Sequence, residues 1–309
     1  MRDKRIDKIM LTNADFRCLS QSFKKGKIGS SYIFATTDGT LSQTLLELLL
    51  CNYYCDDEDS DGPCLKCVNC NKILNRTHID VEYFGLGQNI IKKDEIRLML
   101  DNAITRPFES AHKFLIVENA HNLSELVQNL LLKTLEDIPS FVTIILVTQT
   151  LSKILPTIKS RCQTYQLKPM ARQDLIRLLG STEKALHMVD VADGMLSKAL
   201  QFSNASASFD DRYKFALNLL HNFTSSADLG KHASYLIVRK DSFREILELC
   251  QSVFYLAMKQ KIPNMVDNKI LANMVLLCNE CVNLLDKNIL FNIVVDKFLL
   301  GILKCKVGG

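Results

Sequence analysis

Four cysteines lie close together in the chain, in the spacing Cys55-x8-Cys64-x2-Cys67-x2-Cys70. Four thiolates at this spacing can close a tetrahedron around zinc, with Zn–S distances of about 2.3 Å and no coordination position left open for a substrate. A disulfide network would require an oxidising compartment, and a redox switch would need one exposed thiol of low pKa more than four clustered ones. The spacing therefore predicts a structural zinc ion, bound in a knuckle at residues 55–70.

The other cysteines of the chain predict no chemistry. Cys278 and Cys281 form a CxxC pair, which could be half of a metal site or a redox pair, but they lie inside the apolar helical pattern of residues 270–285 with no second pair nearby. We interpret them as the core of a helix. The remaining cysteines are scattered singly and are expected to be small buried apolar groups: Cys18, Cys51, Cys162, Cys250 and Cys305.

The turn after the first predicted strand has the form of a phosphate-binding loop without its working residues. Such a loop needs small residues, so that backbone amides can approach phosphate, a lysine that reaches the β and γ oxygens, and a hydroxyl for magnesium. Counted from Tyr32 and Gly39, Ser42 stands at the lysine position and Gln43 at the position of the hydroxyl. Because both partners of a triphosphate are missing, we expect the chain to bind no ATP.

A second phosphate-handling element is reduced in the same way. In ATPases an apolar strand ends in acidic residues that hold magnesium and orient the attacking water. Here the strand Phe114–Val117 is followed by Glu118, and the residue that would polarise water is the amide Asn119. A lone glutamate at a strand end is more often solvated than catalytic, so Glu118 is a weak candidate.

Residues 30–167 alternate β-branched apolar runs with helical patterns, which is typical of βαβ units and a parallel sheet. Each predicted strand is short and apolar enough to be buried on both faces. The predicted strands are Tyr32–Ala35, Val81–Phe84, Phe114–Val117, Thr143–Val147 and Thr164–Leu167, and the predicted helices are Leu41–Tyr54, Lys93–Arg106, Ser124–Leu135 and a short turn at Leu155–Ser160.

After Met170 the sequence predicts helices alone. The small polar residues 203–208 look like a hinge or linker, and residues 210–304 carry apolar side chains at three- and four-residue spacing. We therefore predict three parts: an α/β domain at 1–167, a small helical domain at 168–208 and a helical bundle at 209–309.

Composition excludes several classes of protein. The net charge of +4 gives little support for a nucleic-acid surface. The longest apolar runs, Leu45–Leu50 and Phe114–Val117, are far shorter than the about 20 residues that cross a bilayer. No continuous hydrophobic segment near the start suits a secretory signal. We expect a cytoplasmic protein with no membrane partner.

Two further segments resemble a known family. The sequence Leu131-Leu132-Lys133-Thr134-Leu135-Glu136-Asp137-Ile138-Pro139 resembles the LLKTLEEPP segment of bacterial DNA polymerase III clamp-loader subunits, and Ser160-Arg161-Cys162 resembles their SRC motif. The cysteine cluster also follows the degenerate lysine position as it does in that family. The resemblance extends over residues 10–200 and implies an AAA+ P-loop-type α/β domain with a zinc-binding insertion, a helical lid and an all-α collar domain.

Within this family the gamma/tau members bind ATP, whereas the delta-prime members have a decayed nucleotide site and serve as a rigid neighbour. The chain departs from the ATPase pattern at Thr36, Ser42, Gln43 and Asn119, and Ser197 stands where gamma-type members place a lid arginine. The resemblance therefore implies a non-catalytic delta-prime (stator) member without ATPase or polymerase activity of its own.

Arg161 is retained although the rest of the nucleotide site has decayed. An arginine presented across a subunit boundary can stabilise the charge that develops on a neighbour's γ-phosphate, an effect of about 10³–10⁵ in rate. The resemblance implies that Arg161 is such an arginine finger. The simpler alternative is that Arg161 pairs with a local carboxylate or helix end.

The resemblance also implies partners. It predicts a hetero-pentameric ring with gamma/tau and delta subunits, which uses ATP to load a sliding clamp onto primed DNA during replication. Two other interpretations remain open: a gamma/tau-type ATPase whose loop has diverged, and an unrelated zinc-containing nucleic-acid binding protein. The interpretation as an unrelated zinc-containing protein leaves two segments unexplained, the one at residues 131–139 and the SRC segment at residues 160–162.

Overall fold

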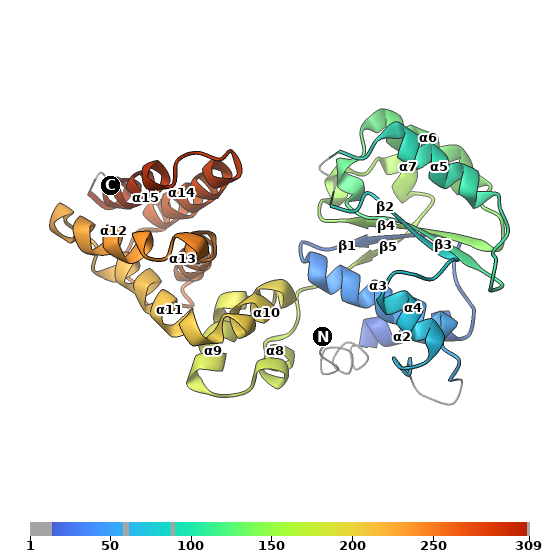
Figure 1. Cartoon of the computed structure of the whole chain (residues 1–309), viewed down its shortest axis with the longest axis horizontal. Helices are drawn as coiled ribbons and strands as arrows, with labels where there is room; N and C mark the ends of the chain where they lie inside the picture. The colour runs from blue at the N-terminus through green and yellow to red at the C-terminus, as the bar shows by residue number, and fades with distance from the viewer. Residues whose placement is uncertain (1–13, 58–61, 88–89, 308–309) are drawn as a thin grey trace. The chain divides into compact units, whose positions relative to one another are not determined.

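A computed structural model describes residues 14–57, 62–87 and 90–307 (Figure 1). Contacts between residues divide the chain into two units. The first comprises Met1–Asp174 with Met195–Ser197, and the second comprises Leu175–Gly194 with Lys198–Gly309.

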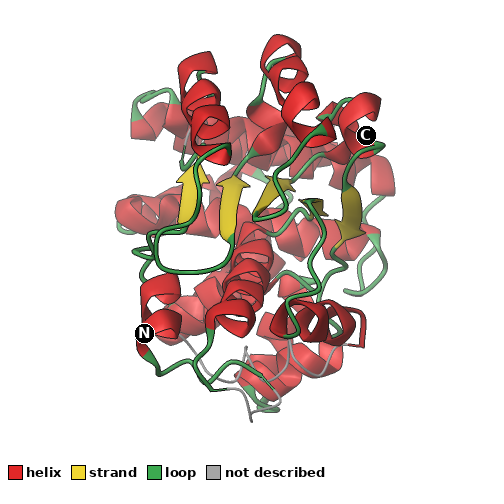
Figure 2. Ribbon diagram, turned by 90° about the vertical axis from the view of Figure 1, so that its right-hand side faces the viewer, coloured by secondary structure: helices red, strands yellow, loops and turns green. Residues whose placement is uncertain are grey.

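The first unit is built on a five-stranded sheet in the order β2-β3-β4-β1-β5, and every pair of neighbouring strands is parallel. Helices α5, α6 and α7 cover one face of the sheet, and α2, α3 and α4 cover the other (Figure 1). Figure 2 shows the strands, in yellow, next to one another. The strands are β1 (Ser31–Ala35), β2 (Val81–Phe84), β3 (Lys113–Val117), β4 (Val142–Thr148) and β5 (Gln163–Gln166).

The helices of this unit connect the strands. Because both faces of a parallel sheet are covered, its strands must be apolar throughout, and the side chains of β1 and β3 are all buried. The helices are α2 (Ala14–Lys24), α3 (Gly39–Tyr54), α4 (Val68–Leu74), α5 (Lys93–Ala103), α6 (Glu125–Glu136) and α7 (Pro156–Lys159), with the short 3-10 helices η1 (Ala120–Asn122) and η2 (Leu151–Lys153).

The register of the sheet sets the position of the candidate site. Ala35 at the end of β1 lies opposite Thr148 of β4, and Val117 at the end of β3 lies opposite Leu146. The carboxyl ends of these three strands therefore meet at one edge, where ligands bind in open α/β sheets. The loops that follow β1, β3 and β4 supply the residues of that edge.

The parallel sheet is confirmed, and each predicted strand is found to within one residue of its predicted ends. One prediction about the strands is wrong: β5 is not buried on both faces. Gln163, Thr164 and Gln166 are exposed and Tyr165 is half-buried, because β5 is an edge strand paired with β1 alone. Helix α5 also ends at Ala103 and not at Arg106.

The second unit contains helices alone within the residues that the structure describes, as the sequence predicts after Met170. The predicted linker at residues 203–208 is wrong, because α10 ends at Asn204 and α11 begins at Ser206. The helices are α8 (Arg172–Leu179), α9 (Glu183–Ala192), α10 (Leu196–Asn204), α11 (Ser206–His221), α12 (Leu229–Ile237), α13 (Phe243–Met258), α14 (Asn268–Asp286) and α15 (Phe291–Val307), with η3 (Ser226–Asp228) and η4 (Lys240–Ser242).

Helices α13, α14 and α15 pack against one another through buried apolar side chains. At Gly301 of α15 an added Cβ would lie 2.5 Å from Cδ2 of Leu277, so the absence of a side chain allows α14 and α15 to approach closely. Cys278 and Cys281 are fully buried in α14, which confirms them as helix core. No helix in the described ranges is long and apolar enough to cross a membrane.

The division of the helical part into a domain at 168–208 and a domain at 209–309 remains a prediction. Most of both segments belongs to the second contact unit, which begins at Leu175. The first of the predicted boundaries, at residue 167, lies close to the end of the first unit's continuous segment at Asp174.

Candidate functional site

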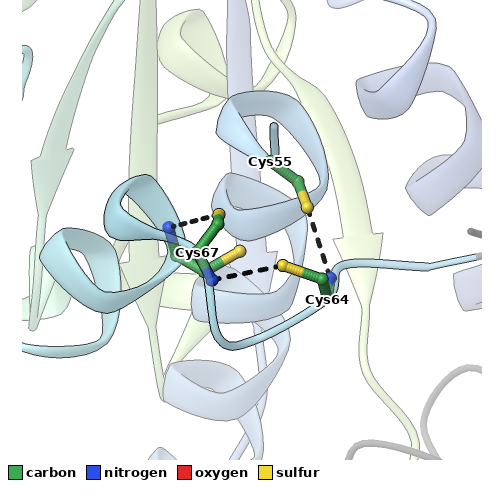
Figure 3. Close-up of side chains that lie close together, drawn as sticks. Cys55, Cys64 and Cys67 are labelled. Atoms are coloured by element: carbon green, nitrogen blue, oxygen red, sulfur yellow. Dashed lines mark hydrogen bonds between the residues drawn. The ribbon is translucent and has the colours of Figure 1, made fainter. Parts of the chain in front are cut away.

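The four clustered cysteines come from the end of one helix, the start of the next and the loop between them. Cys55 is the C-cap of α3, Cys67 is the N-cap of α4, and Cys70 lies in the first turn of α4. Cys64 belongs to the connecting loop, of which residues 58–61 lie outside the described part of the chain. The four sulfur atoms all lie within 4.8 Å of one another. Figure 3 shows Cys55, Cys64 and Cys67 turned toward a common centre.

Backbone amides point at these sulfur atoms. The N–H of Cys64 donates to Sγ of Cys55 at 3.3 Å, the N–H of Cys67 donates to Sγ of Cys64 at 3.3 Å, and the N–H of Cys70 donates to Sγ of Cys67 at 3.4 Å (Figure 3). The N–H of Asp57 also donates to Sγ of Cys55, at 3.4 Å. Such bonds stabilise sulfur in its thiolate form and orient it as a ligand.

The donor set fits a tetrahedral metal ion. With metal–sulfur distances of about 2.3 Å, a tetrahedron has sulfur–sulfur distances of about 3.8 Å, and the sulfurs here are already grouped within 4.8 Å. A hydrogen bond from the backbone of Lys66 lowers the pKa of the Cys64 thiol to about 7, whereas burial raises the pKa of Cys55 to about 12. The grouping of the four sulfur atoms, and not their pKa values in the absence of metal, shows that the cluster can hold a metal ion.

A fifth cysteine lies against the cluster. Cys51 is fully buried in α3, and its thiol donates to the carbonyl oxygen of Cys70 at 3.8 Å, while the Cys70 thiol contacts the carbonyl oxygen of Cys51 at 4.0 Å. Cys51 therefore packs against Cys70, a contact that no spacing in the sequence indicates.

The prediction that the single cysteines are buried is confirmed for Cys51 and Cys250. It is wrong for Cys18, which is exposed because it lies on the outer face of α2, and Cys162 and Cys305 are only partly buried.

The loop after β1 is closed by a residue that the sequence analysis did not single out, Asp38. One carboxylate oxygen, Oδ1, accepts the N–H groups of Thr40 at 3.1 Å and Leu41 at 3.3 Å, and thereby caps α3. The other oxygen, Oδ2, accepts the N–H of Ser197 at 3.2 Å. Asp38 is only 3% exposed. The amides at this helix start, which bind phosphate in nucleotide sites, are thus bonded to the chain's own carboxylate.

The structure brings the four predicted loop residues Thr36, Gly39, Ser42 and Gln43 into this one loop and the first two turns of α3, and each polar side chain bonds locally. Oγ1 of Thr36 accepts the N–H of Asp38 at 3.1 Å, and the Ser42 hydroxyl donates to the carbonyl oxygen of Gly39 at 2.9 Å. The Gln43 amide donates to Glu47 at 2.8 Å on the surface of the helix. None of these groups is a cation.

A cavity of about 330 Å³ lies at this edge of the sheet, and none of the described residues that line it is a lysine or an arginine. Glu118 lines it, but its carboxylate pairs with Arg76 at 2.9 Å. Asn119 has left-handed backbone geometry, with φ of 53°, and its amide donates to the carbonyl oxygen of Gly85 at 3.3 Å. The lining residues are Gly39, Thr40, Ser42, Gln43, Leu46, Glu118, Asn119, Val147, Thr148, Gln149 and Ser197.

Arg161 is not among the residues that line this cavity. Its Nε and Nη2 donate to Oε1 of Glu136 at 3.0 and 2.5 Å, and its Nη1 donates to the carbonyl oxygen of Thr157 at 2.9 Å. Arg161 thus has the local carboxylate partner that the simpler interpretation of the SRC segment requires. Its side chain is 34% exposed, so it can also be reached from outside the chain.

Sequence reasoning missed Asp38, Arg76 and the role of Glu136. Asp38 had a recognisable signal, because an aspartate directly before a helical pattern is a common N-cap. Arg76 lies 42 positions from Glu118 along the chain, and no spacing rule connects the two.

Comparison with known proteins matches most of the first unit to a known family. A family model described as DNA polymerase III, delta subunit, matches residues 12–171. A DNA polymerase III subunit gamma from Buchnera aphidicola subsp. Schizaphis graminum is 30% identical over 194 residues, which are 60% of this chain and 53% of the relative. The DNA polymerase III subunit tau of Escherichia coli is 28% identical over 203 residues, which are 62% of this chain and 31% of the relative.

The chain thus spans about half the length of the first of these relatives and about a third of the second. Among solved structures, a DNA polymerase III gamma subunit-related protein from Thermotoga maritima superposes with a TM-score of 0.54. That match covers 94% of this chain and 99% of the other, with 17% identity, and it establishes a common fold.

Proposed function

This chain belongs to the DNA polymerase III clamp-loader family of AAA+ proteins, and from that premise we propose that it is the delta-prime member, a stator that binds no nucleotide itself. In this role the chain supports the loading of a sliding clamp onto primed DNA, while gamma-type neighbours bind and hydrolyse the ATP that drives the reaction. Its own contribution is a fixed surface in the ring.

The observation that carries this proposal is the carboxylate of Asp38. It accepts the N–H groups of Thr40 and Leu41, where an ATPase of this fold receives phosphate. A triphosphate would have to displace a buried negative charge and would meet neither a lysine nor an arginine in the cavity lining. Coulomb repulsion and the missing cation therefore both oppose binding.

The remaining acidic group of the site is also engaged. Glu118 pairs with Arg76, and the guanidinium of Arg76 lies 4.7 Å from the ring centroid of Tyr83. The pair is mostly buried, with side chains 20% and 25% exposed. A magnesium ion would have to compete with this arginine, and Asn119 cannot act as a base in place of a carboxylate.

Arg161 supplies the active contribution in this proposal. It would act in trans, as an arginine finger on ATP bound by the adjacent subunit. Its exposure of 34% is compatible with contact to a neighbour, and its pairing with Glu136 leaves part of the guanidinium available. The four-cysteine knuckle would hold a structural zinc ion with no part in the chemistry.

The helical second unit offers a surface for assembly into a ring. Ile293 and Leu300 of α15 are 54% and 46% exposed and lie seven positions apart, on one face of the helix. Leu276 of α14 is 63% exposed. Exposed apolar side chains of this size favour a role as the collar that joins neighbouring subunits.

A gamma-type ATPase is the second candidate, because the similar curated proteins named above are gamma and tau subunits. The two functions are separated by titrating the isolated, purified chain with a fluorescent ATP analogue in the presence of Mg²⁺. We expect no saturable binding up to millimolar nucleotide. Binding in the micromolar range would contradict the stator role and favour the ATPase.

A further inference from the structure

The side chain of Arg161 is held by the carboxylate of Glu136. Glu136 is the last residue of α6, and Arg161 lies in the turn between α7 and β5. Oε1 of Glu136 accepts both Nε, at 3.0 Å, and Nη2, at 2.5 Å. One oxygen thereby binds the whole side edge of the guanidinium, the edge formed by Nε and Nη2.

The backbone of α7 fixes the same guanidinium from another direction. Nη1 donates to the carbonyl oxygen of Thr157 at 2.9 Å and contacts Oγ of Ser160 at 3.4 Å. A guanidinium has five N–H donors, and Nη2 keeps one that no residue in the described ranges accepts. That N–H lies on the end edge between Nη1 and Nη2, where it can donate a charge-assisted hydrogen bond to one phosphate oxygen.

Stability does not account for this pair. The two side chains are 34% and 51% exposed, and exposed ion pairs contribute little to folding. Fixing the direction of the arginine matters more, because an arginine loses rotamer entropy when it becomes ordered. An arginine that is already ordered avoids this loss when a phosphate approaches.

We propose that Glu136 is a positioning residue for Arg161, whose carboxylate orients the guanidinium so that its end edge faces an anion of a neighbouring subunit. The inference rests on the proposed function, in which Arg161 acts on ATP bound in trans. Glu136 touches no nucleotide and acts only through Arg161. Its effect therefore requires the arginine to be present.

The test uses a complex reconstituted from the full chain and the ATP-binding clamp-loader subunits of its own organism. Steady-state ATP hydrolysis is measured for Glu136→Ala, Glu136→Gln, Arg161→Ala and the double variant Glu136→Ala/Arg161→Ala. Glu125→Ala, at the opposite end of α6, is the matched control for loss of an exposed glutamate. Size-exclusion chromatography verifies that each variant enters the complex.

We expect Glu136→Ala to lower kcat by about three- to tenfold while the KM for ATP changes by less than about twofold, because orientation acts on the transition state. Glu136→Gln should retain more activity, since its amide oxygen still accepts from Nε. In the Arg161→Ala background, Glu136→Ala should have no further effect. Glu125→Ala should behave as the unmodified chain does.

The outcomes separate this inference from the function on which it rests. If Arg161→Ala lowers hydrolysis and Glu136→Ala does not, the positioning role is overturned and the trans role of Arg161 stands. The same conclusion follows if Glu136→Ala lowers hydrolysis by the same factor in the Arg161→Ala background as in the unmodified chain. A higher rate for Glu136→Ala also overturns positioning, because the carboxylate would then compete with phosphate. An unchanged rate for Arg161→Ala overturns both.

A second measurement needs no partner subunits. In the isolated chain, the Nε–H of Arg161 should exchange with water more slowly than that of the exposed Arg106, as observed by NMR. Glu136→Ala should remove this difference, and Glu125→Ala should not. An Nε–H of Arg161 that exchanges as fast as that of Arg106 in the unmodified chain would contradict the fixed orientation.

Discussion

Asp38 shows how one residue changes the use of a common structural element. A helix start offers unpaired N–H groups and a positive dipole end, which can receive either a side-chain carboxylate or a ligand anion. In this chain the carboxylate takes the N–H groups of Thr40 and Leu41 and adds the N–H of Ser197. The negative charge at this helix start therefore comes from a side chain of the protein itself, and these N–H groups have their acceptor without a nucleotide.

Replacement of Asp38 tests the strength of this arrangement. Asp38→Ala leaves three N–H groups without their acceptor, a buried one on Leu41 and partly buried ones on Thr40 and Ser197. It should lower the free energy of unfolding by about 2 kcal/mol, at the upper end of the range for N-cap losses. Asp38→Asn should lower the free energy of unfolding by less than Asp38→Ala does. The asparagine has one amide oxygen, which can still cap α3 while its NH₂ group faces Ser197. Urea denaturation of the purified chain measures both.

The control for this experiment is Asp267→Ala. Asp267 caps α14 through a single bond, to the N–H of Lys269, and is exposed. We expect Asp267→Ala to lower the free energy of unfolding by about 1 kcal/mol or less. An Asp38→Ala variant no less stable than Asp267→Ala would show that the three bonds of Asp38 do not act together.

His112 makes stability depend on pH. It is 8% exposed, and burial lowers its pKa from 6.5 to about 4. Its Nε2 lies 2.9 Å from the hydroxyl of Thr143, which itself donates to the carbonyl oxygen of Gly29. Because the hydroxyl proton is used, Nε2 of His112 carries the hydrogen and donates to Oγ1 of Thr143.

The unfolded chain binds a proton at this histidine below about pH 6.5, whereas the folded chain stays neutral down to about pH 4. The contribution of the neutral, buried His112 to the free energy of unfolding is therefore fully present above pH 6.5. It is lost as the pH falls toward 4, by at most about 3 kcal/mol. Denaturation curves measured at several pH values give the free energy of unfolding across this range. It should fall less with decreasing pH for His112→Gln, whose amide can still donate to Thr143. An equal slope in both proteins would exclude this contribution.

Sequence patterns at the residue scale predicted a cluster of thiols that are neighbours in the chain and missed partners that are distant. The thiols of Cys64, Cys67 and Cys70 follow a short spacing that is typical of zinc sites, and the structure groups them with Cys55. The pairing of Glu136 with Arg161 joins residues 25 positions apart and depends on how α6 packs beside α7. No periodicity in a single sequence reveals such a contact.

At the scale of elements, the cysteine cluster ties the end of α3 to the start of α4. Cys55 ends one helix and Cys67 begins the next, so a bound metal ion would fix both helix ends and the loop between them. Behind the cluster, α3 buries Leu48, Leu49 and Cys51 against the core of the unit. Loss of the metal should therefore loosen an edge of the unit and leave the sheet intact.

We expect one zinc ion per purified chain, measured by elemental analysis. Cys64→Ser should abolish the zinc and lower the melting temperature by about 5 °C or more, because metal binding adds to the stability of the folded state. Cys18→Ser removes an exposed cysteine outside the cluster and should change neither quantity. A folded, purified chain without zinc would contradict the assignment of the cluster.

Element types followed from hydrophobic periodicity, and the errors came from tertiary context. The pattern of residues 164–167 predicted a buried strand, but β5 is an edge strand paired with β1, and of its four side chains only that of Tyr165 is half-buried while the others are exposed. Residues 203–208 are small and polar, which favours a linker, yet alanine and serine are also accepted in helices. There α10 and α11 are separated by Ala205 alone.

At the scale of the whole molecule, the two units suit a subunit that works through its neighbours. The first unit carries a nucleotide fold whose phosphate-binding amides are bonded internally, together with a partly exposed arginine. The second unit carries a helical bundle with exposed apolar side chains on α14 and α15. In the proposed function, these two features act on ATP and on surfaces of other subunits.

The arrangement of these subunits in a ring was inferred from a family resemblance, because one chain contains no record of its neighbours. The motifs at residues 131–139 and at Ser160-Arg161-Cys162 identified the family, which the match over residues 12–171 then established. The choice of the delta-prime role depends on the decayed loop, for which Asp38 now provides a physical reason.

The most direct test is a crystal structure of the chain determined in the presence of millimolar Mg·ATP. We expect the carboxylate of Asp38 to remain bonded to the N–H groups of Thr40 and Leu41, with no phosphate density in the adjoining cavity. Density for a triphosphate beside Gly39 and Ser42, with Asp38 displaced from the start of α3, would contradict the stator function.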